Sequence, residues 1–199
     1  MRADARANRQ DLVAAAARLM GEQGSAMSLR AVAQAAGVGV GTLYRHFPTR
    51  RDLVTAVMDH VEARLEAIVQ RFLDSADTPA AEDAHGGDDV AAHWHAMARE
   101  LGAENLLALL AARDDMSPEE CPPPEQVDAV EERVLARAQA AVDRAARAGL
   151  VAAGVSGEQY LAGVLTVTRP FPLSIEGRNR ADREWLLEVF LRGLRADSR

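Results

Sequence analysis

The residues best suited to bind another molecule lie in the sequence GVGVGTLYRHFPTRRDL, residues 37–53, where three glycines precede a polar and aromatic cluster. Hydroxyl, guanidinium and imidazole groups follow within five positions, on Thr42, Tyr44, Arg45 and His46. Such groups donate hydrogen bonds to phosphate oxygens, and an arginine can also bind the edge of a guanine base. This stretch therefore indicates contact with nucleic acid, provided that the local structure places the side chains on one surface.

Two short helices joined by a tight turn would present these groups. Ser28 is a good N-cap for a helix over residues 29–36, and Gly37 suits the positive φ that a tight turn requires. Gly39 stands at the N-cap position of a second helix, over about residues 40–47, which a proline ends. A longer helix follows, so the pattern predicts a helix-turn-helix.

The helix over residues 40–47 has two distinct faces on a wheel drawn at about 100° per residue. Leu43 and Phe47 lie about 40° apart and belong to the core, whereas Gly41 and Arg45 occupy the opposite arc. A glycine inside a helix costs ~1 kcal/mol relative to alanine, so local stability does not explain Gly41. Close approach of the bare backbone at Gly41 to the major groove of DNA would explain a glycine at this position.

The charge distribution also favours a polyanionic partner. Residues 1–51 hold eight arginines against three acidic residues, a net charge of +5, whereas the remaining residues hold 15 arginines against 27 acidic residues, a net charge of −12. A basic segment on an acidic protein is typical of a surface that meets a polyanion, although a chance fluctuation of charge would look the same.

Composition and short motifs exclude several classes of protein. No apolar run reaches the ~18–20 residues of a membrane-spanning helix, and the N-terminus has no apolar segment typical of a secretory signal. The single cysteine, Cys121, excludes an internal disulfide and suits a reducing compartment. We therefore expect a cytoplasmic protein without a membrane partner.

No catalytic constellation is visible, because the sequence lacks the motifs GK[ST], GxSxG and HExxH. His93 and His95 invite a metal-site interpretation, but residues two positions apart on a helix point about 200° apart and cannot easily share one ion. We predict no enzymatic activity, no metal and no cofactor.

Helical patterns cover nearly the whole chain, with aromatic residues at only 4% and no sustained alternation of polar and apolar residues. The fold predicted is all-α, with a loop over residues 75–89 and a break over residues 117–125. The nine expected helices lie at about 7–23, 29–36, 40–47, 49–74, 93–101, 106–112, 126–148, 157–168 and 181–196. We divide the chain into a DNA-binding head, residues 1–50, and a ligand-binding and dimerising body, residues 51–199.

The head resembles the TetR family of bacterial transcriptional regulators. That family's pattern, roughly A-G-V-S-x-G-T-L-Y-x-H-F-x-[ST]-K-x-x-L, is matched by the sequence AGV at 36–38, by GTLY at 41–44, by HF at 46–47, and by Thr49 and Leu53. The similarity covers about residues 8–55. Two departures are Gly39, where a hydroxyl N-cap is usual, and Arg50, where lysine is usual.

The resemblance implies a nine-helix, two-part architecture and assigns roles to residues of the head. It places Ser28, Thr42, Tyr44, His46 and Arg50 on the DNA backbone, and Arg30, Val40, Gly41 and Arg45 near the bases. The implied partners are double-stranded operator DNA, a second copy of the chain and a small-molecule effector.

The body is expected to bind the effector between the fourth helix and the helix that follows the loop. We predict a mainly apolar cavity with Met58, Phe72, Trp94 and Met97 in its wall, although the same residues could simply form the core. Because the fourth helix begins at the head and continues into the body, an effector that tilts it would change the distance between the two heads of a dimer. Both recognition helices must enter major grooves about one helical turn, or a multiple, apart.

The last two helices are predicted to form the dimer interface, as they do in proteins of the family that the head resembles. The final helix has a broader apolar face than one antiparallel partner covers, so pairing across a two-fold axis would complete a four-helix bundle. The residues expected there are Tyr160, Leu161, Val164 and Leu165 of the first helix and Trp185, Leu186, Val189 and Phe190 of the second.

The function predicted is that of a repressor that leaves its operator when a small molecule binds. Three alternatives stay open: an activator, a regulator that responds to no ligand, and a helical ligand-binding protein without a role on DNA. The last of these would have no use for the outward face around Gly41.

Overall fold

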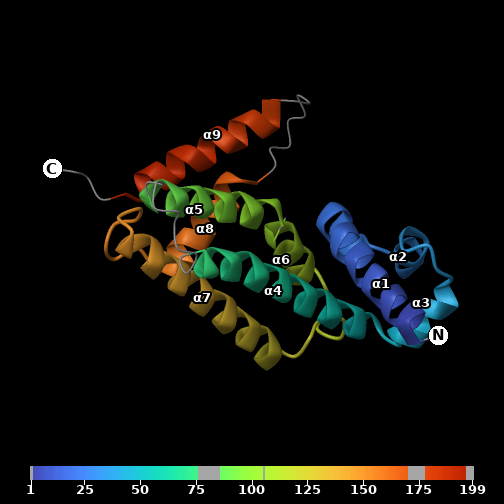
Figure 1. The fold of residues 1–199 in the computed structure, drawn as a ribbon. Coiled ribbons are helices and arrows are strands. Elements are labelled where there is room, and N and C mark those ends of the chain that lie inside the picture. Colours follow the sequence, from blue (N-terminus) through green and yellow to red (C-terminus); the bar gives the residue numbers. More distant parts are fainter. Residues whose placement is uncertain (1, 76–85, 105, 170–177, 196–199) are drawn as a thin grey trace. The chain divides into compact units, whose positions relative to one another are not determined.

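A computed structural model describes residues 2–75, 86–104, 106–169 and 178–195, and within these ranges every regular element is helical (Figure 1). The all-α prediction is therefore confirmed. The elements are α1 (Arg2–Gln23), η1 (Gly24–Ala26), α2 (Leu29–Ala35), α3 (Val40–His46), α4 (Arg50–Asp74), α5 (Gly86–Ala103), α6 (Leu106–Asp114), α7 (Pro124–Arg147), α8 (Gly157–Val167) and α9 (Arg178–Gly193). No helix in the described part is long and apolar enough to cross a membrane.

Element boundaries differ from the predicted ones at three places, and the first is α1, which begins at Arg2, five residues before its expected start. The loop expected over residues 75–89 is wrong for residues 86–89, because α5 begins at Gly86; residues 76–85 lie outside the described ranges. The final helix begins at Arg178 and ends at Gly193, three residues earlier at each end than expected. At all three starts the helix begins in small or polar residues that precede its apolar pattern.

The chain packs as two compact units. Unit 1 contains residues 1–63 and 105–130, and unit 2 contains residues 64–104 and 131–199. The helix α4 contributes residues to both units, and so does α7.

In unit 1 the core forms where α1 packs against α2, α3, η1 and α6. The helix α1 turns one apolar face inward, because its apolar residues recur at spacings of three and four. Its buried residues are Leu12, Val13, Ala15, Ala16, Leu19 and Met20. From the facing helices Val32, Leu43 and Phe47 close the same core, each at most 1% exposed. Burial of Leu43 in this core fixes which side of α3 faces outward.

The turn between α2 and α3 has the geometry that its sequence predicts. The Ser28 hydroxyl accepts a hydrogen bond from the Ala31 backbone N–H at 3.1 Å and caps α2. Gly37 has a φ of +68°, and the Val38 N–H donates to the Ala33 carbonyl at 3.0 Å, as in a Schellman C-cap. A glycine is required here because other residues rarely adopt this conformation.

The first turn of α4 is closed by a capping box, as the sequence predicts. The Asp52 N–H donates to the Thr49 hydroxyl at 3.1 Å, and the Thr49 N–H donates to the Asp52 carboxylate at 2.9 Å. Hydrogen bonds from the hydroxyl and backbone N–H of Thr49 lower the pKa of the Asp52 carboxyl. The capping carboxylate is therefore retained to lower pH than a free aspartate would be.

In unit 2 the helices α5, α8 and α9 pack against one another (Figure 1). Two glycines allow this close packing. A Cβ atom added at Gly163 of α8 would collide with the ring of Phe190 on α9, and one added at Gly102 of α5 would collide with Thr168. A second capping box, between Ser156 and Gln159, begins α8.

Candidate functional site

The outward face of α3 has the form that contact with a DNA groove requires. A Cβ atom added at Gly41 would meet nothing within 4 Å, so the backbone is bare at that point. Tyr44 is 50% exposed and Val40 37% exposed, and Arg45 is also exposed. Thr42 and His46 are half-buried at the edges of this face. On α2 and at its start, Arg30 and Ser28 are exposed.

Arg50 is the exception among the residues expected on phosphate. Its guanidinium group donates to the carbonyl oxygens of Ser25 at 2.7 Å and Met27 at 2.8 Å. Its Nε lies 3.4 Å from a carboxylate oxygen of Glu120. Arg50 therefore ties the segment before α2 to the start of α4 within unit 1, and its contact with DNA stays a prediction.

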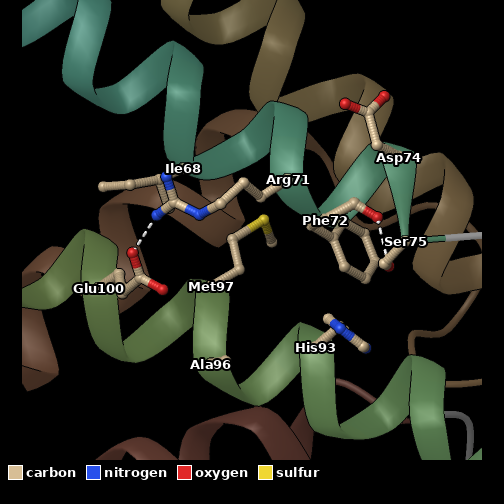
Figure 2. Close-up of a pocket in the computed structure, with 9 residues that line it drawn as sticks. All are labelled: Ile68, Arg71, Phe72, Asp74, Ser75, His93, Ala96, Met97 and Glu100. Carbon is tan, nitrogen blue, oxygen red and sulfur yellow. Dashed lines mark hydrogen bonds and ion pairs between the residues drawn. The ribbon is translucent and has the colours of Figure 1, made fainter.

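A pocket of about 400 Å³ lies in unit 2 between the end of α4 and the middle of α5 (Figure 2). Two of the four residues expected in a ligand cavity, Phe72 and Met97, line it. Trp94 is not in the wall but directly behind it, since its ring centroid lies 5.4 Å from that of Phe72. Met58 is half-buried on the part of α4 that belongs to unit 1 and is not a lining residue.

The pocket wall is mixed, whereas the sequence predicts a mainly apolar one. The apolar lining residues are Ile68, Phe72, Ala96 and Met97, and the polar ones are Arg71, Asp74, Ser75, His93 and Glu100. The charged groups are largely compensated nearby. Figure 2 shows Arg71 of α4 in an ion pair with Glu100 of α5, and the Asp74 carboxylate pointing away from the other lining side chains.

Three aromatic rings of unit 2 pack together: Phe72 of the pocket wall, Trp94 and Tyr160. Trp94 of α5 stacks on Tyr160 of α8, with 4.4 Å between ring centroids and 28° between ring planes. The Phe72 ring packs against Trp94 with an angle of 54° between the ring planes. Neither the Trp94 Nε1 nor the Tyr160 hydroxyl has a hydrogen-bond partner. Burial raises the pKa of the Tyr160 hydroxyl above its ordinary value, so it stays protonated.

A buried arginine supports the same cluster. Arg144 of α7 is 8% exposed, and its guanidinium carbon lies 4.8 Å from the centroid of the Phe72 ring. It donates to the Leu73 carbonyl and, at 3.4 Å, to the Ser75 hydroxyl. Sequence reasoning missed this residue. The available signal was its position at the edge of the buried arc formed by Ala138, Ala141, Val142 and Ala145.

The residues expected at a dimer interface fall into two groups. Tyr160, Leu161, Val164 and Leu165 of α8 are buried within unit 2, at 0–8% exposed, where α8 packs against α5, α7 and α9. On α9, Leu186 and Phe190 are half-buried, and the Phe190 ring contacts the backbone at Gly163. Trp185 and Val189 remain open, at 64% and 46% exposed, one helical turn apart.

Comparison with known proteins gives the same family as the residues of the head. The profile described as "Bacterial regulatory proteins, tetR family" matches residues 12–57. HTH-type transcriptional regulators from Staphylococcus aureus are 37% identical over 73 residues, which is 36% of this chain. The matched segment spans only 38% of the length of those relatives.

Solved structures extend the likeness over nearly the whole chain. A TetR transcriptional regulator from Streptomyces coelicolor is 28% identical with a TM-score of 0.70, over 96% of this chain and 99% of that one. A TetR transcription regulatory protein from Mycobacterium vanbaalenii is 26% identical with a TM-score of 0.64, over 98% and 99%. Residues 12–57 have the helix-turn-helix of the TetR family of bacterial transcriptional regulators, and the chain as a whole is similar to solved TetR regulators.

Proposed function

We propose that the protein is a homodimeric repressor that occupies an operator through α3 and leaves it when a small molecule binds in unit 2. The observation that carries the DNA-binding part is the face of α3, where bare backbone at Gly41 lies beside the exposed side chains of Tyr44 and Arg45. In this proposal the head is residues 1–50, and residues 51–199 bind the ligand and form the dimer.

The proposal of ligand release is supported by α4 and by the pocket. The helix α4 starts with the capping box beside the head, and its last turns carry Ile68, Arg71 and Phe72 into the pocket wall. A ligand that displaces the end of α4 needs a coupling free energy of only ~1–3 kcal/mol to weaken operator binding about 5–150-fold. DNA must then weaken ligand binding by the same factor.

The test of the function begins with selection of binding sites from random duplex DNA by the purified protein. The selected site is placed over a promoter, and transcription is measured in vitro with and without the protein. Repression that a small molecule relieves supports the proposal. Increased transcription identifies an activator, and failure to enrich any duplex sequence contradicts a role on DNA.

Substitution of Gly41 by alanine separates stability from DNA binding. The added methyl group meets no neighbour, so Gly41→Ala should raise the free energy of unfolding by about 0.5–1 kcal/mol through helix propensity. The same methyl group would stand between α3 and the groove and should weaken operator binding. Urea unfolding and fluorescence anisotropy with the selected duplex measure the two effects. A variant that is more stable and binds DNA as tightly as the wild type would contradict close approach at Gly41.

Arg45 and Tyr44 should differ in how they affect sequence preference. Loss of a base contact in Arg45→Ala should cost ~1–3 kcal/mol on the operator and relax preference at one base pair. Tyr44→Phe removes only a hydroxyl and should weaken all duplexes nearly equally. Affinities for the operator and for single-base-pair variants distinguish these outcomes. Unchanged preference in Arg45→Ala would show that Arg45 contacts only the DNA backbone.

A further inference from the structure

The aromatic cluster of Phe72, Trp94 and Tyr160 contains two hydrogen-bond donors that the fold leaves without partners. Trp94 is 1% exposed and Tyr160 is fully buried, so water at the protein surface does not reach them. Among the described residues, the buried side-chain polar atoms without a hydrogen bond are the Trp94 Nε1, the Tyr160 hydroxyl oxygen and the Arg50 Nε. Two of these three belong to stacked rings in one place.

An unpaired donor in a protein interior costs about 1–3 kcal/mol, so two of them on a pair of stacked rings require an explanation. Packing alone does not supply it. Phenylalanine at both positions would fill the interior with aromatic rings and leave no polar atom unpaired. The indole N–H can only donate, so its missing partner must carry a hydrogen-bond acceptor.

The Trp94 ring lies one side-chain layer behind the pocket, and the Tyr160 ring stacks on Trp94. Phe72 belongs both to the pocket wall and to the aromatic cluster, and Met97, one turn after Trp94 on α5, lines the pocket beside it (Figure 2). Methionine is flexible and adapts its shape readily. A rotation of these two side chains would therefore open a path from the pocket toward the Trp94 ring without moving a helix.

The charges around the pocket do not select a charged ligand. Arg71 pairs with Glu100, His93 lies 3.1 Å from an Asp89 carboxylate oxygen, and the Asp74 carboxylate accepts from Gln70 at 2.7 Å. The guanidinium group of Arg144 is directed to the last carbonyls of α4, where the helix dipole favours a cation. The groups left unsatisfied are neutral donors.

We propose that the pocket has an inner compartment that binds a neutral, planar aromatic molecule through a carbonyl oxygen, which accepts from the Trp94 indole N–H and the Tyr160 hydroxyl. The aromatic body of the ligand stacks in the cluster with Phe72. This inference names the ligand class of the site used in the proposed function and rests on that function for its biological meaning. Binding itself is tested without DNA.

A matched pair of probes tests the acceptor. The ketone 1-indanone and the hydrocarbon indane differ only in the replacement of a carbonyl by a methylene group. In ¹H–¹⁵N spectra of the whole protein, 1-indanone should shift the indole N–H signal of Trp94 downfield, as a new hydrogen bond does, and indane should not. The chain has two tryptophans, so the Trp185→Phe variant assigns the signal.

A second experiment removes one of the two hydrogen-bond donors. Tyr160→Phe keeps the ring and should weaken 1-indanone binding about threefold to tenfold while leaving indane binding unchanged. It should also raise the melting temperature of the free protein, because it removes a buried unpaired hydroxyl. The control is Thr166→Val, which removes a hydroxyl from the exposed side of the same helix and should change neither affinity.

Four results would overturn the inference: no saturable binding of 1-indanone at millimolar concentration, equal affinity for the two probes, an unmoved Trp94 signal, or equal behaviour of Tyr160→Phe and Thr166→Val. Operator binding is measured separately by anisotropy. A shifted Trp94 signal without any effect on DNA leaves the inner compartment intact and contradicts ligand release. A different compound that releases DNA without moving the Trp94 signal contradicts only the inner compartment.

Discussion

Operator affinity is expected to fall about 10³–10⁴-fold when the salt concentration is raised from 50 to 200 mM. The reason is the net charge of +5 on residues 1–51, together with exposed polar groups around α3. If each head neutralises ~3–4 phosphates, the dimer's plot of log K against log salt should have a slope of about −5 to −7. Anisotropy titrations of a labelled operator at five salt concentrations measure that slope.

A control for this prediction uses an arginine of unit 2. Arg137 donates to the Glu66 carboxylate at 2.6 Å and is not part of the basic segment. Arg137→Gln should leave the slope unchanged, whereas Arg30→Gln should make it less negative. A slope near zero for the wild type would contradict the DNA-binding function itself.

Substitution of both Trp185 and Val189 by glutamate should convert the proposed dimer to monomers. The two side chains form the exposed apolar part of α9, and a charge on each would have to be buried in an interface. Light scattering should then report 21.4 kDa, the mass of one chain, in place of twice that value. Operator affinity should fall by about 10²–10⁴-fold, since each head would bind its half-site alone.

Trp185 and Val189 are chosen so that the substitutions test dimer assembly and not the folding of unit 2. Val164, also expected at the interface, has no exposed surface, so a charge there would unfold unit 2 whatever the oligomeric state. Leu110→Glu on α6, at a leucine that is 37% exposed, is the control and should stay dimeric. A dimeric Trp185→Glu, Val189→Glu variant with normal circular dichroism would place the interface elsewhere.

The helix-turn-helix was predictable because its signals are local. Ser28, Gly37 and the Thr49 with Asp52 pair each act within three or four residues, and each makes the hydrogen bond or adopts the φ angle expected. The buried face of α3 was predictable for the same reason. A helical period assigns Leu43 to one side and Gly41 to the other without knowledge of the rest of the fold.

The tertiary roles of single residues were not predictable from such signals. Arg50 looks like a free basic residue in sequence, but its partners Ser25 and Glu120 lie 25 and 70 positions away. A stripe of apolar residues along a helix likewise does not reveal which element packs against it. In α8 the covering surfaces are α5 and α9 of the same chain, which the amphipathic pattern alone does not distinguish from a second copy.

The lining of the candidate pocket was likewise only partly predictable from the sequence. An apolar group around Phe72, Trp94 and Met97 was expected, and these residues do lie together. The polar half of the wall depends on pairing between α4 and α5, as in the ion pair of Arg71 with Glu100, 29 positions apart. Residue spacing contains no information about such a pair.

The return of residues 105–130 to unit 1 imposes an order on the folding of a nascent chain. The α1 surface that α6 covers, and the Pro118 carbonyl that accepts from Arg51 at 2.9 Å, find their partners only after the intervening residues have been synthesised. Chains grow at about 5–20 residues per second, so α1, α2 and α3 wait several seconds on the ribosome with that surface uncovered. The helix-turn-helix is thus first in the sequence, but its unit cannot finish folding until residues 105–130 have been synthesised.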